Sequence, residues 1–140
     1  MVLMTIPFLA CMASVAAFYH LPPRVLPSIQ AVEAGFPGLI HMNRDGSQDL
    51  GVMQVNTRWV QPLAAQAGMA QAVAQQRLLF DPCFNIAAAG AIMRIYLDEA
   101  HGDVLRAVGY YHSHTQPLAD AYRSQVIASA TRLFSGSPPR

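Results

Sequence analysis

The sequence predicts a mainly α-helical single domain, with about six helices around a cleft and a short irregular or β-hairpin region. The chain has 140 residues, which is enough for one domain with a proper hydrophobic core. It is 53% hydrophobic and only 12% charged, a composition that suits a compact helical protein. Apolar residues recur with the helical period along most of the chain, and no predicted strand is longer than residues 51–55.

The first 18 residues carry no charged side chain and allow two interpretations. They could be a signal peptide, but no basic segment precedes the apolar run, and cleavage near residues 14–17 would remove Cys11. Alternatively, residues 1–9 are an apolar segment and the first helix of the domain runs from Ala10 to His20. We favour the helix, and we assign residues 10–134 to the domain and residues 135–140 to a flexible tail.

The remaining elements follow from start and stop signals. Pro23 fits the first turn of a helix over residues 23–34, which Gly35 and Pro37 end. Residues 35–56 should form loop or a short hairpin around the turn dipeptide Asp45-Gly46, with residues 51–55 extended. Further helices are predicted over 58–67, in part of 69–80, over 82–100 with Asp81 as cap, over 103–112, and from Pro117 onwards.

Glu33 lies on the apolar stripe of the second predicted helix, because Leu26, Ile29 and Glu33 are spaced i, i+3 and i+7. A lone carboxyl group among apolar side chains is costly to ionise, so we expect a raised pKa. The only other glutamate, Glu99, lies in a polar run typical of a solvated helix end. The simpler interpretation of Glu33 is a glutamate paired with an arginine.

Charge and spacing argue against several other classes of site. The net charge is +1 and no basic stripe is visible, so we expect no nucleic-acid partner. Residues 43–49 do not match a calcium loop, since glycine is not sixth and no acidic twelfth ligand follows. His112 and His114 lack a third ligand at a zinc-binding spacing. We therefore expect neither a metal nor an organic cofactor.

The stretch after Glu33 carries a family resemblance. The glutamate at a helix end is followed by N…GS.D.G.MQ.N, which closes with the hexapeptide GVMQVN at residues 51–56. This pattern resembles the lysozyme-like lytic transglycosylases, most closely the small ones that accompany type IV and type III secretion machines. Residues 110–113, YYHS, resemble the second signature of that family, and the resemblance covers about residues 10–128. It implies a lysozyme-like fold that cleaves the glycan strands of peptidoglycan.

The resemblance also implies roles for individual residues. Glu33 takes the place of the single catalytic glutamate, which protonates the leaving oxygen and then accepts the proton of the sugar's own 6-hydroxyl. Met53 and Gln54 would line the site around the scissile bond, with Asn56 supporting the loop. Tyr111 would bring its hydroxyl within reach of Glu33, unless it is a core tyrosine, and Tyr122 is carried over as a further substrate-binding position.

Three further positions complete the expected site. Ser47 lies in the polar loop that would form the cleft floor, and it either binds substrate or serves only the turn. Cys11 and Cys83 are either two free core cysteines or a disulfide, and the resemblance implies that relatives linked to secretion carry the same pair. Such a bridge requires an oxidising compartment such as the periplasm. The chain departs from the family at Ala34, where a serine usually follows the glutamate.

Together these features predict a monomeric periplasmic or exported enzyme that cleaves the MurNAc–GlcNAc β-1,4 bond and leaves 1,6-anhydro ends. Its partners would be peptidoglycan strands and components of a secretion or conjugation apparatus, for which it would open the wall locally. Two alternatives remain open: a lysozyme-type hydrolase (muramidase) of the same fold, and a non-catalytic assembly subunit.

Overall fold

A computed structural model describes residues 5–135 of the chain and confirms the mainly α-helical, lysozyme-like fold. The helices of this range are α1 (Leu9–Tyr19), α2 (Val25–Glu33), α3 (Val60–Ala67), α4 (Gln71–Phe80), α5 (Pro82–Glu99), α6 (Val104–His112) and α7 (Gln116–Phe134), with a 3₁₀ turn at Thr57–Trp59. The predicted first helix is present as α1. The proposed domain and tail bounds stay predictions, because residues 1–4 and 136–140 lie outside the described range.

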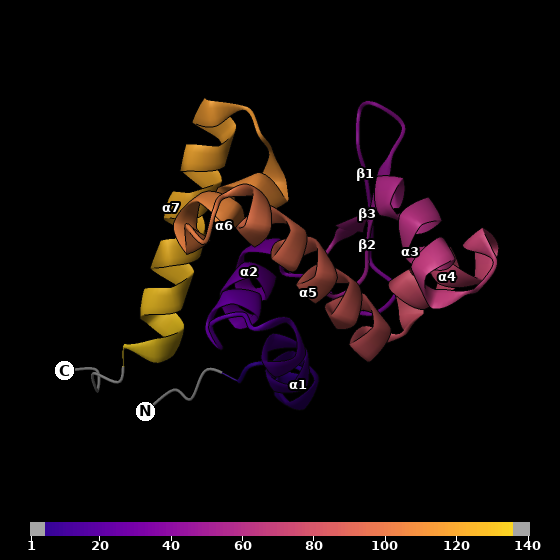
Figure 1. The fold of residues 1–140 in the computed structure, drawn as a ribbon, viewed down its shortest axis with the longest axis horizontal. Coiled ribbons are helices and arrows are strands. Elements are labelled where there is room, and N and C mark those ends of the chain that lie inside the picture. The colour runs from indigo at the N-terminus through magenta and orange to yellow at the C-terminus, as the bar shows by residue number, and fades with distance from the viewer. Residues whose placement is uncertain (1–4, 136–140) are drawn as a thin grey trace.

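Helix α5 runs through the middle of the molecule, with α1, α4 and α6 packed against it (Figure 1). Helix α7 packs along α2 and α6 on one side, and the small sheet lies with α3 and α4 on the other. Gly90 of α5 allows the approach of α1, because a Cβ atom there would collide with Val15. In the described part of the chain no single helix is long and apolar enough to cross a membrane. Helices α4 and α5 meet the length and hydropathy requirement only when counted together, and they are bent by 105° at the break between them.

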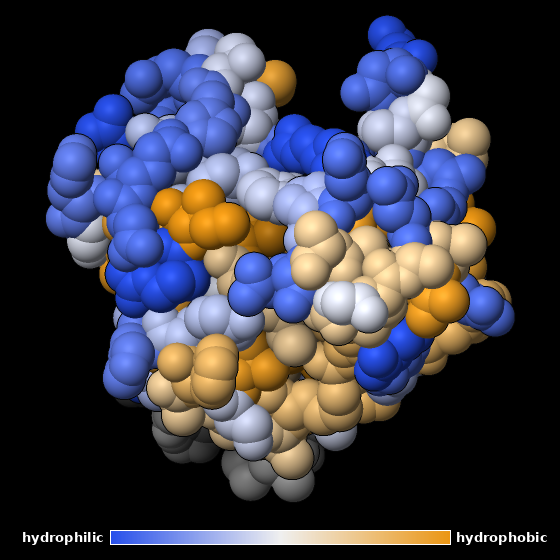
Figure 2. Space-filling model, turned by 45° about the vertical axis from the view of Figure 1, so that its right-hand side comes forward, coloured by the Kyte–Doolittle hydropathy of each residue, from blue (hydrophilic) through white to orange (hydrophobic). Residues whose placement is uncertain are grey.

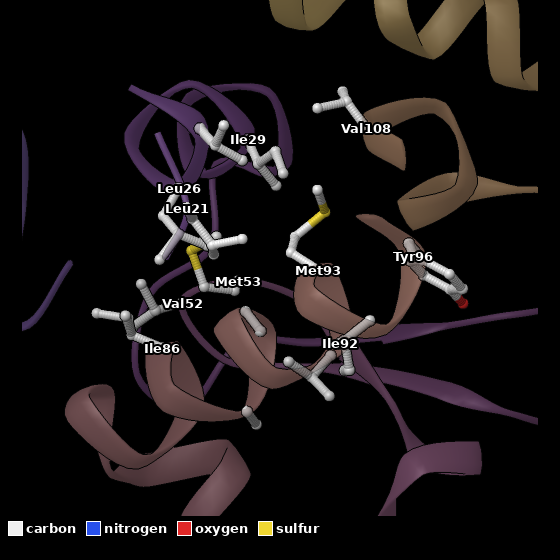
Figure 3. Packing of buried hydrophobic residues seen from close by; sticks show 14 of the residues in the cluster. Leu21, Leu26, Ile29, Val52, Met53, Ile86, Ile92, Met93, Tyr96 and Val108 are labelled. Atoms are coloured by element: carbon white, nitrogen blue, oxygen red, sulfur yellow. The ribbon is translucent and has the colours of Figure 1, made fainter. Parts of the chain in front are cut away.

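The core is continuous from the N-terminal helices to α5 and α6 (Figure 3). Leu26 and Ile29 of α2 are fully buried, and so is Ile86 of α5. Burying one such side chain stabilises the fold by about 1.5–3 kcal/mol. This packing holds α2, which ends at Glu33, rigidly against the centre of the molecule.

A three-stranded antiparallel sheet follows α2, in the order β1 (Ile40–Met42), β2 (Gln48–Leu50) and β3 (Val55–Asn56). The turn at Asp45-Gly46 joins β1 to β2, as predicted, and projects from the molecule at the upper right of Figure 1. The expectation that residues 51–55 are extended is wrong. Residues 51–54 form a turn in which Gly51 and Gln54 have positive φ angles of 70° and 52°, and only Val55 and Asn56 are in a strand.

A disulfide joins Cys11 of α1 to Cys83 in the first turn of α5, so the two cysteines are not free. The bonded residues are 72 positions apart and their Cα atoms are separated by 5.5 Å. Closing a loop of this length contributes roughly 4 kcal/mol in the chain-entropy model, by restricting the unfolded chain.

Candidate active site

A cleft of about 420 Å³ separates the β1–β2 loop from the helical part of the molecule. Figure 2 shows the surface notched at the top, beside the hydrophilic projection at the upper right. Residues from α2, the sheet region, α5 and α6 line the cleft: Glu33, Asn43, Arg44, Asp45, Ser47, Asp49, Gln54, Val55, Asn56, Arg58, Trp59, Ile92, Tyr111 and His112. The lining is therefore mostly polar, with large aromatic side chains at Trp59 and Tyr111.

Glu33 is the last residue of α2, and the chain turns sharply after it. Ala34 adopts a left-handed conformation with φ of 54°, and its N–H donates to the carbonyl of Gln30 at 2.7 Å. The next residue, Gly35, packs so closely on the backbone of Gly51 and Val52 that no Cβ atom would fit. The helix end that carries the carboxyl group is therefore locked onto the turn of residues 51–54.

The Glu33 carboxyl group is mostly enclosed, and burial raises its pKa above the ordinary value. The hydroxyl of Tyr122 donates to Glu33 Oε2 at 2.6 Å and lowers the pKa. The negative charge of Asp49 raises it again, and His41 lowers it slightly. No arginine of residues 5–135 forms an ion pair with Glu33, so the simpler interpretation does not hold there. This environment suits a carboxyl group that keeps its proton.

The expectation that Tyr111 is the hydroxyl partner of Glu33 is wrong, because Tyr122 of α7 makes that hydrogen bond. Tyr111 donates its hydroxyl to the carbonyl oxygen of Met53 at 2.7 Å instead. The rings of Tyr111 and Tyr122 lie nearly parallel, with centroids 6.5 Å apart, and His112 stacks on Tyr122 at 5.0 Å. Burial raises the pKa of both tyrosine hydroxyls well above the ordinary value, so they act as donors.

Asn85 of α5 fixes the turn of residues 51–54 from the interior of the molecule, and its side chain is fully buried. Asn85 Oδ1 accepts from the N–H of Met53 at 2.8 Å, and its Nδ2 donates to the carbonyls of Leu50 and Leu78, both at 2.8 Å. The expectation that the Met53 side chain lines the cleft is wrong, since it is fully buried and points into the core (Figure 3). Gln54, in contrast, does line the cleft.

Asn56 connects the loop to the sheet. Its Nδ2 donates to Ser47 Oγ at 3.0 Å and to Asp49 Oδ1 at 2.9 Å, while its Oδ1 accepts from the N–H of Arg58. Ser47 also donates its hydroxyl to Asp45 Oδ1 at 2.6 Å, so it has the turn role as well as a place in the cleft wall. The hydrogen bonds of Asn56 and Ser47 to Asp45 and Asp49 hold the β1–β2 loop in one position relative to Glu33.

Sequence reasoning did not single out Asp49, Arg58, Trp59 or His112 as site residues, although all four line the cleft. Trp59 is the only tryptophan of the chain and follows the GVMQVN hexapeptide by three positions, which was an available signal. The Arg58 guanidinium lies 5.8 Å from the Trp59 ring centroid and donates to the Tyr96 hydroxyl. Within residues 5–135, no three histidine, cysteine, aspartate or glutamate side chains lie together in a way that could hold a metal ion.

Comparison with known proteins agrees with this geometry. The family model described as transglycosylase SLT domain matches residues 10–133. Invasion protein IagB of Salmonella typhimurium is 30% identical over 116 residues, which are 82% of this chain and 69% of that protein. Protein IpgF of Shigella flexneri is 26% identical over 117 residues, which are 83% of this chain and 73% of that protein. Residues 10–133, which the family model matches, include every residue that lines the cleft.

Proposed function

The chain belongs to the transglycosylase SLT domain family, and from this premise we propose that it is a peptidoglycan lytic transglycosylase with Glu33 as its catalytic acid and base. One observation carries the proposal: a single enclosed glutamate, with a raised pKa and a tyrosine hydroxyl on one oxygen, faces a polar cleft. A carboxyl group that keeps its proton near neutral pH is what cleavage of a glycosidic bond needs.

The proposed reaction has two steps. Glu33 gives its proton to the oxygen of the MurNAc–GlcNAc bond, the bond from this oxygen to the sugar's C1 breaks, and positive charge spreads over C1 and the ring oxygen. The 6-hydroxyl of the same sugar then attacks C1, and its proton returns to the Glu33 carboxylate. The product is a 1,6-anhydro ring, and the enzyme is restored without water entering the reaction.

The remaining wall of the cleft suits a sugar chain. Gln54 and Asn43 offer amide groups for hydroxyl and N-acetyl groups, and Trp59 offers an aromatic face on which a sugar ring can pack. A muramidase of the same fold would use the same cleft but would place a water molecule on C1. It is the second candidate, because Asp49 adds a carboxylate to the cleft, as hydrolases with two carboxylates have.

We also propose that the enzyme works in the periplasm, where it opens the wall locally for a secretion or conjugation apparatus. Two observations support this setting. The Cys11–Cys83 disulfide fits an oxidising compartment. A protein named for invasion is among the relatives, which fits a role beside machinery that crosses the cell envelope.

The test is the rate at which the purified protein releases soluble fragments from isolated peptidoglycan sacculi. We expect Glu33→Gln to lower this rate by at least about 100-fold, since the amide cannot donate a proton to the leaving oxygen. The matched control is Glu99→Gln, the same change at the only other glutamate, which is exposed and paired with His114. Equal rates for the wild type and Glu33→Gln would exclude Glu33 as the catalyst.

A further inference from the structure

We propose that Arg58 makes the cleft selective for sugars that carry a carboxylate, because its guanidinium group binds that carboxylate. The inference rests on the proposed function and names the part of the glycan strand that the cleft recognises. In peptidoglycan every second sugar is MurNAc, which differs from GlcNAc by a lactyl group on O3. The lactyl carboxyl group is either free or joined to a stem peptide, which brings carboxylates of its own. A basic side chain in the cleft would therefore distinguish MurNAc from GlcNAc.

The backbone of Arg58 is held in a fixed place beside the sheet. Arg58 lies in the 3₁₀ turn Thr57–Trp59, directly after β3, and lines the cleft. Asn56 caps this turn, because its Oδ1 accepts from the backbone N–H of Arg58 at 2.9 Å. The side chain of Asn56 also donates to Asp49 of β2. The turn that carries Arg58 is thus tied to the central strand.

The side chain of Arg58 is oriented by two aromatic residues. Its Nη2 donates to the hydroxyl of Tyr96 at 3.2 Å, and its guanidinium carbon lies 5.8 Å from the centroid of the Trp59 ring. Tyr96 of α5 is only 5% exposed, and its ring packs edge-on against Trp59 with the centroids 6.1 Å apart. A side chain that is already held loses less conformational entropy when it binds a ligand. The guanidinium group of Arg58 is therefore preorganised.

This guanidinium group keeps most of its hydrogen-bonding capacity for a ligand. An arginine has five N–H donors, and it pairs with a carboxylate through two parallel hydrogen bonds. Of the side-chain donors of Arg58, only Nη2 has a partner within residues 5–135, and no carboxylate of that range forms an ion pair with it. In contrast, Arg77, Arg94 and Arg123 each pair with an aspartate three or four positions away.

Asp45 also lines the cleft, but it is not a counter-ion of Arg58. Its Oδ1 accepts from the hydroxyl and the backbone N–H of Ser47, at 2.6 and 2.9 Å. These two hydrogen bonds lower the pKa of Asp45 most, and the charge of Arg58 lowers it least. Arg58 is thus near enough to Asp45 to act on its charge and too far away to pair with it. The space between them belongs to the cleft and is open to a ligand.

The test measures binding to three disaccharides that contain no MurNAc–GlcNAc bond and are therefore not cleaved. They are GlcNAc–MurNAc with a stem peptide, GlcNAc–MurNAc with a free lactyl carboxyl group, and GlcNAc–GlcNAc, which has no carboxylate. Trp59 is the only tryptophan of the chain and lines the cleft, so its fluorescence reports binding. We expect the wild type to bind a MurNAc disaccharide about 10-fold more tightly than GlcNAc–GlcNAc. Which of the two MurNAc forms gains affinity identifies the source of the carboxylate.

Three variants assign this preference to one side chain. Arg58→Gln removes the charge, so we expect it to abolish the preference and to leave the affinity for GlcNAc–GlcNAc unchanged. Tyr96→Phe removes only the hydroxyl that holds the guanidinium group, and it should lower the preference by about 3-fold. The matched control is Arg132→Gln, which removes the same charge from the last turn of α7, outside the cleft, and should change nothing.

Three results would overturn the proposal. One is equal affinity of the wild type for all three disaccharides, and another is a preference that survives in Arg58→Gln. The third is an Arg58→Gln variant that binds all three disaccharides more weakly by the same factor, which would make Arg58 a structural residue or a balancing charge for Asp45. The proposed function fails separately, because the titration involves no cleavage. A fully active Glu33→Gln variant would remove the catalytic assignment and leave the measured affinities as they are.

Discussion

Two opposing effects act on the pKa of the Glu33 carboxyl group, its burial and its hydrogen bond with Tyr122. Burial favours the protonated carboxyl group, whereas a hydroxyl that donates to Oε2 favours the ionised carboxylate. The first effect is the larger, so the pKa stays raised. An acid that gives away a proton and later takes one back needs such a balance, since either extreme would slow one of the two steps.

Replacing Tyr122 by phenylalanine should show this balance directly. The variant loses the donor to Glu33, so the pKa of Glu33 rises further and the alkaline limb of the pH–rate profile moves to higher pH. The rate should fall by about 10-fold or more, because the carboxyl group is less well oriented. The matched control is Tyr19→Phe on α1, outside the cleft. A limb that moves to lower pH in Tyr122→Phe would contradict the assignment.

The enclosed Glu33 carboxyl group should also lower the free energy of unfolding at neutral pH, as groups enclosed for catalysis often do. Its pKa is raised in the folded protein. The contribution of Glu33 to the free energy of unfolding is therefore most favourable below the ordinary pKa of 4.5, and it falls as the pH rises through the folded pKa. We therefore expect Glu33→Gln to raise the melting temperature by a few degrees at pH 7. The gain should disappear below about pH 4, where both proteins are neutral at this position. Melting curves at the two pH values, with Glu99→Gln as control, measure it.

At the scale of elements, the turn of residues 51–54 links the sheet with α2, α5 and α6. Gly35 of the α2 end packs against it, Tyr111 donates to it from α6, and Asn85 binds it from α5. Gly51 needs its positive φ, and a Cβ there would collide with the Leu78 carbonyl. The cleft is therefore shaped by one buried turn, on which the sheet and three helices meet.

Asn85→Ala tests the importance of this turn. The substitution leaves the N–H of Met53 and the carbonyls of Leu50 and Leu78 buried without their partner. We expect the free energy of unfolding to fall by about 3 kcal/mol or more, since each unsatisfied buried group costs about 1–3 kcal/mol. Chemical denaturation measures the change, with the exposed Gln66→Ala on α3 as control. A loss of under about 1 kcal/mol would mean that the turn holds without Asn85.

Several helices were predictable because they carry their own start or stop signals. Pro82 with Asp81 as cap, for example, marks the start of α5, and the Asp81 carboxylate does accept from the N–H of Phe84. The hairpin followed equally from Asp45-Gly46. The burial of Met53 could not be predicted in this way, since it depends on the left-handed Gln54 and on Asn85, 32 positions away.

The hydrogen bond to Glu33 comes from Tyr122 and not from Tyr111 for a similar reason. Both tyrosines were candidates from the sequence, but their roles depend on how α7 packs on α2 and α6, which no local pattern encodes. The place of Asp49 required the register of all three strands. Sequence reasoning therefore identified the acid and most of its neighbours, while the assignment of hydrogen bonds had to come from tertiary packing.

At the scale of the whole molecule, the disulfide ties α1 to the helix around which the domain is built. We expect the double variant Cys11→Ala and Cys83→Ala to lose about 2–4 kcal/mol of unfolding free energy. No residue of α1 and none of the first turn of α5 lines the cleft, so the rate on sacculi at low temperature should stay close to that of the wild type. Denaturation curves with and without reductant check the loss, since reductant should affect only the wild type. Equal stability of the two proteins would contradict this role.

The central claim is that one enclosed carboxyl group cleaves the glycan strand and lets the sugar close on itself. Mass spectrometry of the fragments released from sacculi by the purified wild type tests this most directly. The proposed mechanism predicts fragments that end in 1,6-anhydro-MurNAc, lighter by one water molecule than hydrolysed ends. Fragments with only reducing MurNAc ends would contradict it and would identify a muramidase.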